Sequence, residues 1–153
     1  MPFSTILAAI DGGEQTAQVL DQALRLAEGN PTATLHLVCV LDTLPVTAAG
    51  MGGSADLTLE VQDARARQTL REGLAHLARA GRSGHAHVVV GAQAPAIIAE
   101  AERLGCDILV LGHRHMSLWR QMFGQSTCAD VLEQAPCPLL IVTERTGEAP
   151  HSS

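Results

Sequence analysis

The segment 112–127, GHRHMSLWRQMFGQST, holds side chains that could bind a phosphate group. Arg114 and His115 can donate charge-assisted hydrogen bonds to phosphate oxygens. Ser126 or Thr127 stands where a helix-like stretch begins, and the unpaired amides and positive dipole end of a helix start favour an anion. The same hydroxyl groups also fit a helix that is merely well capped, so the segment alone leaves both interpretations open.

Asp11 is a second candidate, because it directly follows the aliphatic run TILAAI at 5–10. A carboxylate at the end of a buried strand can accept hydrogen bonds from the hydroxyl groups of a ribose. The alternative is a structural role, in which Asp11 caps the first helix by bonding the amide of Gly13 or Glu14. Its position favours neither role over the other.

Two histidine pairs, His85-x-His87 and His113-x-His115, have a spacing that places both imidazoles on one side of a strand. Neither pair has a third Cys, His or carboxylate at a recognisable offset. We therefore predict no metal site.

The composition excludes several classes of function. The net charge is −6 and all ten basic residues are Arg, which argues against a nucleic-acid partner and rules out a P-loop lysine or a lysine nucleophile. No stretch resembles a signal peptide or a membrane span, and the four cysteines form no C-x-x-C pair. We expect a cytoplasmic protein with reduced thiols and no membrane partner.

Short aliphatic runs alternate with helical patterns along the chain. The runs predict strands at 5–10, 35–41, 87–90, 107–112 and 138–142. Helices are predicted between them: one over 17–27; one with an apolar stripe of Leu57, Val61, Ala64, Leu70, Leu74 and Leu77; one beginning at Pro95 and closed by Gly105; and one from Ser126 or Thr127 to before Pro136.

This alternation predicts the α/β class, with an open, doubly wound, five-stranded parallel sheet in the order 3-2-1-4-5 and helices on both faces. Ligands of such sheets bind beyond the carboxyl ends of the strands where the strand order reverses, which here lies between the first and fourth strands. Asp11 and the start of the segment 112–127 follow those two strands. We expect one domain over 1–145, with a flexible or partly helical loop at 42–56 and a disordered tail at 146–153.

Several stretches together resemble the universal stress proteins over nearly the whole chain. They are ILAAIDGGEQTAQVLDQALRLA, LVCVLD, VVVGAQAPAIIAEAERLGCDILVLGHRH and STCADVLEQAPCPLLIV. The resemblance implies a Rossmann-like fold of the adenine nucleotide alpha hydrolase type. It also implies a stress-response regulator or sensor.

Nucleotide-binding members of that family carry the motif G-x2-G-x9-G-[S/T] after the fourth strand. Aligned without gaps, Gly112 and Ser126 match its first and last positions, whereas His115 and Gln125 replace its other two glycines. A side chain at either position would enter the space in which backbone amides meet phosphate oxygens. Gly124 lies one position too early to replace the third glycine.

The resemblance implies a nucleotide site for ATP or AMP, with Mg²⁺ accompanying ATP. Its expected residues are Ala9, Asp11, Val40, Gly112, Arg114, His115, Gln125, Ser126 and Thr127. Asp11 would contact the ribose and Val40 would offer backbone groups to the adenine. No catalytic residue is predicted, and slow ATP hydrolysis is the most activity that we expect.

The last predicted strand would be an edge of the sheet. An uncharged aliphatic edge is a template for pairing with another chain. We expect a homodimer in which the two copies pair through Pro138, Leu139, Leu140, Ile141 and Val142, as the resemblance also implies. Three functions stay open: a nucleotide-binding regulator with unidentified protein partners, a dimeric interaction module without nucleotide, and an ATP-hydrolysing or adenylate-handling enzyme.

Overall fold

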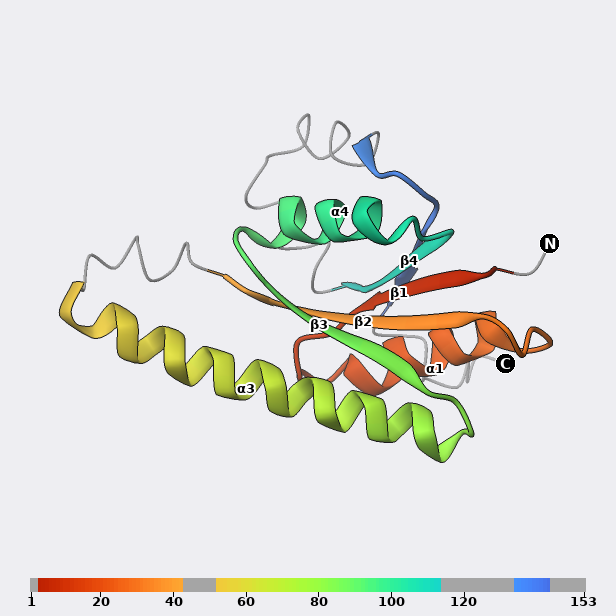
Figure 1. The fold of residues 1–153 in the computed structure, drawn as a ribbon, viewed down its shortest axis with the longest axis horizontal. Coiled ribbons are helices and arrows are strands. Elements are labelled where there is room, and N and C mark those ends of the chain that lie inside the picture. Colours follow the sequence, from red (N-terminus) through yellow and green to blue (C-terminus); the bar gives the residue numbers. More distant parts are fainter. Residues whose placement is uncertain (1–2, 43–51, 114–133, 144–153) are drawn as a thin grey trace, which may run out of the picture.

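The computed structural model describes residues 3–42, 52–113 and 134–143, which build one parallel sheet with helices on both faces (Figure 1). The strand order is β3-β2-β1-β4-β5, and each neighbouring pair is parallel. The predicted fold class and strand order are therefore confirmed.

Each strand lies close to its predicted range. The strands are β1 (Thr5–Ala9), β2 (Thr34–Leu41), β3 (Gly84–Val90), β4 (Ile108–Gly112) and β5 (Leu139–Val142). The helices are α1 (Thr16–Ala27), α3 (Gly52–Arg79) and α4 (Gln93–Leu104). None of the helices described here is long and apolar enough to cross a membrane.

Two helix boundaries differ from their predictions. Helix α3 begins at Gly52, inside the range 42–56 that we expected to be a flexible or partly helical loop. Pro95 is the third residue of α4 and not the first. Its missing N–H is harmless there, because the first four amides of a helix have no acceptor within the helix. The predicted last helix and the predicted tail lie almost entirely outside the described residues.

The sheet is buried on both faces. One hydrophobic cluster lies between the strands and helices α1 and α3, and a second lies between the strands and α4 (Figure 1). Successive strand residues contribute to the two clusters in turn, so that Leu37 and Cys39 belong to the first and Val38 to the second. Aliphatic runs are what such a doubly covered strand requires.

The apolar stripe predicted for α3 is wrong at Val61 and Ala64, and the side chain of Leu57 lies outside the described residues. Ala66, Leu70 and Leu77 are buried against the sheet, whereas Val61 is 46% exposed. Val61 precedes Leu70 by nine residues, or about two and a half turns, so the two side chains leave opposite sides of the helix. Apolar residues at that separation cannot share one face.

Gly73 allows α3 to lie close on the sheet. A Cβ atom at this position would lie 2.9 Å from Leu37 Cδ1 and 3.0 Å from Ile10 Cδ1, closer than carbon atoms normally pack. Both neighbours are buried, so neither can turn aside into solvent.

Replacing Gly73 by Ala tests this close approach. In an exposed helix interior, Gly→Ala stabilises by about 0.5–1 kcal/mol. Here we expect destabilisation of about 1–3 kcal/mol, because the added methyl group overpacks the core. Urea unfolding measures the change. A gain in stability for Gly73→Ala would show that the helix has room to move away from the sheet.

Candidate functional site

At the carboxyl side of the sheet, strand β1 ends before its two neighbouring strands do. Its last pairs are Ala9 with Val38 of β2 and Ala8 with Val110 of β4. Beyond these pairs β2 continues to Leu41 and β4 to Gly112. The position beyond β1 is therefore flanked on both sides by strands that extend further, at the point where the strand order reverses.

The backbone of Val40 is turned toward this position. The amide of Ile10 donates to the carbonyl oxygen of Val38 at 3.0 Å, whereas the amide of Gly91 donates to that of Leu41 at 3.0 Å. Because backbone groups alternate in direction along a strand, Val40 points to the same side as Val38, toward β1. Its groups lie beyond the last β1 residue, as the family resemblance requires for contact with a base.

Asp11 lies at the same end of the sheet. Its side chain is exposed, and its Oδ1 accepts a hydrogen bond from the Gly13 amide at 2.8 Å. Helix α1 begins only at Thr16, after the N-cap residue Gln15, and no side chain caps it. The helix-capping role considered for Asp11 is therefore wrong, although the predicted bond to Gly13 is present.

The glycine next to Asp11 has a conformational requirement. Gly12 adopts φ +81°, which is strained for residues with a Cβ atom, and a Cβ there would lie 2.8 Å from Thr69 Oγ1. The turn after β1 thus depends on glycine whether or not a ligand is bound.

Gly112, the first residue of the expected phosphate segment, contacts Gln15. A Cβ on Gly112 would lie 2.8 Å from Gln15 Oε1. The Gln15 side chain continues across to β5, where its Nε2 donates to the Val142 carbonyl oxygen at 3.1 Å. Gln15 therefore fills the space beside Gly112, and a Cβ at position 112 would displace the end of this flexible side chain.

Four expected site residues fall within the described structure, and it brings them to one end of the sheet. Ala9 is buried at the end of β1, Asp11 follows it, Val40 is near the end of β2 and Gly112 ends β4. The remaining expected residues lie outside the described residues: Arg114, His115, Gln125, Ser126 and Thr127.

The described cysteines are poor nucleophiles. Burial, and secondarily the Asp11 carboxylate, raise the pKa of Cys39 to about 11. Burial is also the main cause that raises the pKa of Cys106 to about 12, and it raises the pKa of Cys137. These thiols stay protonated at neutral pH, and no disulfide joins them.

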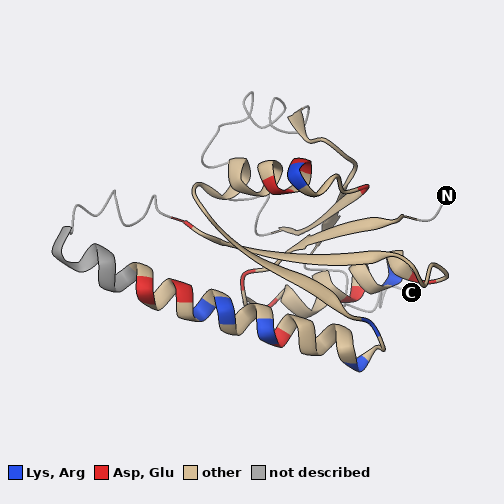
Figure 2. Cartoon of the chain, in the orientation of Figure 1, with Lys and Arg blue, Asp and Glu red and all other residues tan. Residues whose placement is uncertain are grey.

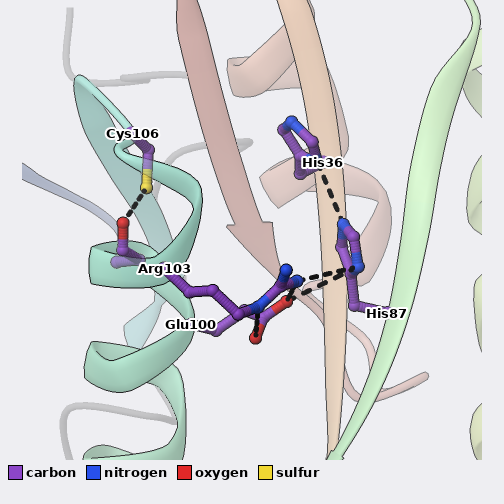
Figure 3. Close-up of polar contacts among 6 residues, drawn as sticks. His36, His87, Glu100, Arg103 and Cys106 are labelled. Atoms are coloured by element: carbon purple, nitrogen blue, oxygen red, sulfur yellow. Dashed lines mark hydrogen bonds and ion pairs between the residues drawn. The ribbon is translucent and has the colours of Figure 1, made fainter.

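A polar cluster that no sequence motif indicates lies on the α4-covered face of the sheet (Figure 3). His36 Nδ1 and His87 Nε2 are 2.9 Å apart, and His87 Nδ1 is 3.5 Å from both Glu100 Oε2 and Arg103 Nη2. Arg103 also donates to both oxygens of Glu100, whose side chain is only 6% exposed. We refer to His36, His85, His87, Glu100 and Arg103 as the histidine cluster.

The strand register assembles the cluster. His36 is directly opposite His85, and the His36 ring stacks on those of His85 and His87 with centroids 5.1 and 5.2 Å apart. The pair His85-x-His87 thus gains a third imidazole from β2, which no short motif shows. Even so, no group of three or more potential ligands among the described residues could hold a metal ion.

The cluster favours the neutral forms of His36 and His87. Burial, followed by the neighbouring His87 and His85, lowers the pKa of His36 from 6.5 to about 4, and burial also lowers the pKa of His87. The hydrogen bond from Arg103 holds the pKa of Glu100 below its usual value, and the same bond raises that of Arg103. One neutral arrangement satisfies the contacts: His87 Nε2–H donates to His36, and His87 Nδ1 accepts from Arg103.

Comparison with known proteins places these features in a family. The family model of the Universal stress protein family matches residues 2–143. Universal stress protein A homolog 1 of Coxiella burnetii is 31% identical over 148 residues, which cover 93% of this chain and 97% of that protein.

Two solved structures share the fold. One is a universal stress protein in complex with cAMP, with TM-score 0.63, 22% identity and coverage of 93% of this chain and 98% of the other. The second is the universal stress protein of Archaeoglobus fulgidus in complex with dAMP, with TM-score 0.65, 19% identity and coverage of 93% and 99%.

The histidine cluster predicts a loss of stability in acid. A histidine with a folded-state pKa of about 4 binds fewer protons than its unfolded form, whose pKa is 6.5. The stabilisation by neutral His36 is therefore complete above pH 6.5 and is lost as the pH falls toward 4. Urea unfolding between pH 7.5 and 4.5 measures the slope.

His36→Asn should flatten this slope, because the amide can occupy the place of Nδ1 but does not titrate. His113→Asn is the control, since His113 is exposed. Equal slopes in the wild type and His36→Asn would contradict the role assigned to the cluster.

Proposed function

Because the chain belongs to the universal stress protein family, we propose that it is a small cytoplasmic stress-response regulator that binds an adenine nucleotide beyond the carboxyl end of β1. The observation that carries the proposal is that Asp11 and the backbone of Val40 both lie just beyond the carboxyl end of β1. Asp11 presents an exposed carboxylate, and Val40 directs backbone groups to the same position.

These groups suit the two parts of a nucleoside. A carboxylate accepts hydrogen bonds from ribose hydroxyls, while a backbone N–H and C=O can pair with the edge of adenine. The complexes of two similarly folded proteins with cAMP and dAMP support the same ligand class. Burial keeps the described thiols protonated, so none of them is a ready nucleophile.

The phosphates would lie toward Gly112, at the end of β4. Arg114 and His115 follow it in sequence and could donate to phosphate oxygens, with Mg²⁺ accompanying ATP. The side chains of His115 and Gln125 stand in place of family glycines, so the phosphates depend on side-chain donors more than on backbone amides. AMP has one phosphate group, so it needs fewer hydrogen-bond donors from this part of the site than ATP does.

A dimeric interaction module without nucleotide is the second candidate. The contact of Gln15 with Gly112 favours it, because Gln15 occupies the space beside that residue without a phosphate. Mass analysis of the supernatant from denatured protein separates the two candidates. Nucleotide in that supernatant supports the regulator, and no nucleotide with no saturable binding supports the module.

Asp11→Asn tests the proposed ribose contact. Asn can keep the acceptor for the Gly13 amide but loses the charge, so the turn is retained. We expect AMP affinity to fall roughly tenfold to 100-fold, since a hydrogen bond to a charged group contributes about 1.5–3 kcal/mol. Isothermal titration with AMP and with Mg-ATP measures the change.

Asp63→Asn is the matched control, because Asp63 lies on α3 and forms an ion pair with Arg67. It should leave the affinity unchanged. If the wild type binds AMP and Asp11→Asn binds it equally well, the nucleotide does not lie against β1 as proposed.

We also propose that the protein is a homodimer through β5. The amide of Leu109 donates to the Pro138 carbonyl oxygen at 3.0 Å, so backbone groups at 138 and 140 face β4 and those at Leu139 and Ile141 face outward. No described strand pairs with that outer edge, and β5 carries no charge. Such an edge is a template for antiparallel pairing with a second copy.

Leu139→Pro tests this interface by removing an outward amide while leaving the bonds to β4 intact. We expect sedimentation velocity to show a shift from dimer to monomer. Leu139→Ala loses similar packing but keeps the amide, so it should remain dimeric. Dissociation of both variants, or of neither, would contradict pairing through the backbone of β5.

A further inference from the structure

The opposite edge of the sheet is also open. Strand β3 pairs with β2, and no strand among the described residues pairs with its outer side. Because the Gly91 amide bonds Leu41 of β2, alternation directs the backbone groups of Ala86, Val88 and Val90 outward. Three amides and three carbonyls thus face away from the sheet along one uncharged strand.

A groove runs along this edge on the side of α3. It encloses about 420 Å³ and is lined by Arg67, Leu70, Arg71, Leu74, Ala86 and Val88. Ala86 and Val88, whose backbone groups face outward, also line the groove with their side chains. Just beyond the groove lies Val90, whose side chain is 63% exposed. Among the described residues, Val61 is the other large hydrophobic side chain that is exposed.

The groove is basic although the whole chain is acidic. Its only ionisable lining residues are Arg67 and Arg71, in a protein of net charge −6. Charged residues concentrate on the helices and are absent from the strands (Figure 2). Arg71 donates to the neutral amide oxygen of Gln68, and none of the described carboxylates forms an ion pair with it.

Arg67 is also available to bind a carboxylate of a partner. Its Nε bonds Asp63 at 2.9 Å, but the two side chains are 60% and 38% exposed, so water weakens the pair. Both guanidinium groups can therefore meet a further carboxylate in a bidentate contact.

We propose that β3 and this groove dock an acidic, extended segment of a partner protein, which adds a sixth strand to the sheet. The backbone of the segment bonds the outward groups of Ala86 and Val88. Its carboxylates, at alternate positions that face α3, meet Arg67 and Arg71 beside Leu70 and Leu74, whereas the side chains between them face the other side of the sheet. This is strand addition, in which the backbone supplies affinity and the alternate side chains supply specificity.

A second copy of the chain fits this edge less well. Two copies of β3 paired about a two-fold axis would place both pairs of Arg67 and Arg71 on the same interface. Like charges would then face each other, whereas an acidic segment removes the repulsion and supplies the complementary charge.

The experiment uses a fluorescein-labelled peptide of alternating Glu and Val, seven residues long, and a matched peptide with Lys in place of Glu. Fluorescence anisotropy at low ionic strength should show saturable binding of the acidic peptide only. Binding should also slow hydrogen exchange at the amides of Ala86 and Val88, which a purely electrostatic contact would not do.

Two kinds of variant separate backbone pairing from charge. Ala86→Pro removes an outward amide at an exposed edge position and should abolish binding, whereas Ala86→Val keeps the amide and should bind. Arg67→Glu combined with Arg71→Glu should weaken the acidic peptide by at least about tenfold and favour the basic one. Arg25→Glu, on the exposed side of α1, makes the same kind of change elsewhere and should have no effect.

The proposal is overturned if the acidic peptide does not bind at millimolar concentration, or if Ala86→Pro binds it as well as Ala86→Val does. Self-association that Ala86→Pro abolishes would assign the edge to a second copy and overturn it as well. Circular dichroism and urea unfolding establish that each variant is folded. None of these results depends on nucleotide binding at β1.

Discussion

Parallel hydrogen bonding among five uncharged strands is the constraint on which the rest of the structure depends. Parallel neighbours need a crossover for every strand, and the crossovers place helices on both faces, so the strands must be apolar on both sides. The same arrangement gathers all carboxyl ends at one side of the sheet. It also leaves two edges, β3 and β5, whose outer backbone groups have no partner among the described strands.

The histidine cluster shows how the fold handles polar groups on a covered face. Helix α4 lies over β1, β2 and β3. Its residue Glu100 faces the sheet and is nearly fully buried. Burial of a carboxylate is costly unless it is paired, and here Arg103 pairs with both of its oxygens. The neutral imidazoles of His36 and His87 then extend the hydrogen bonds to β2 and β3, so the cluster joins the edge strand to the helix above it.

Much of the fold could be predicted from sequence because its signal is local. An aliphatic run such as ILVLG and the turn residues beside it lie within a few positions of each other, and such runs marked every strand. The start of β3 was missed by three residues, since Gly84, His85 and Ala86 carry no aliphatic pattern. The histidine cluster could not be predicted because it depends on which residue of β2 lies opposite His85, and register has no local signature.

The candidate nucleotide site shows which residues carry information about function. Gly112 matches the first glycine of the family motif, yet it also packs against Gln15, whereas Gly12 is required by its positive φ whether or not a ligand is bound. Counting glycines therefore cannot separate a binding loop from a well-packed one. Asp11 is more informative, because the late start of α1 at Thr16 removes its helix-capping explanation. Its exposed carboxylate accepts the Gly13 amide and lies beyond β1, the first of the three central strands to end. An exposed carboxylate at the switch point of the sheet is therefore a stronger indication of a ligand than a glycine is.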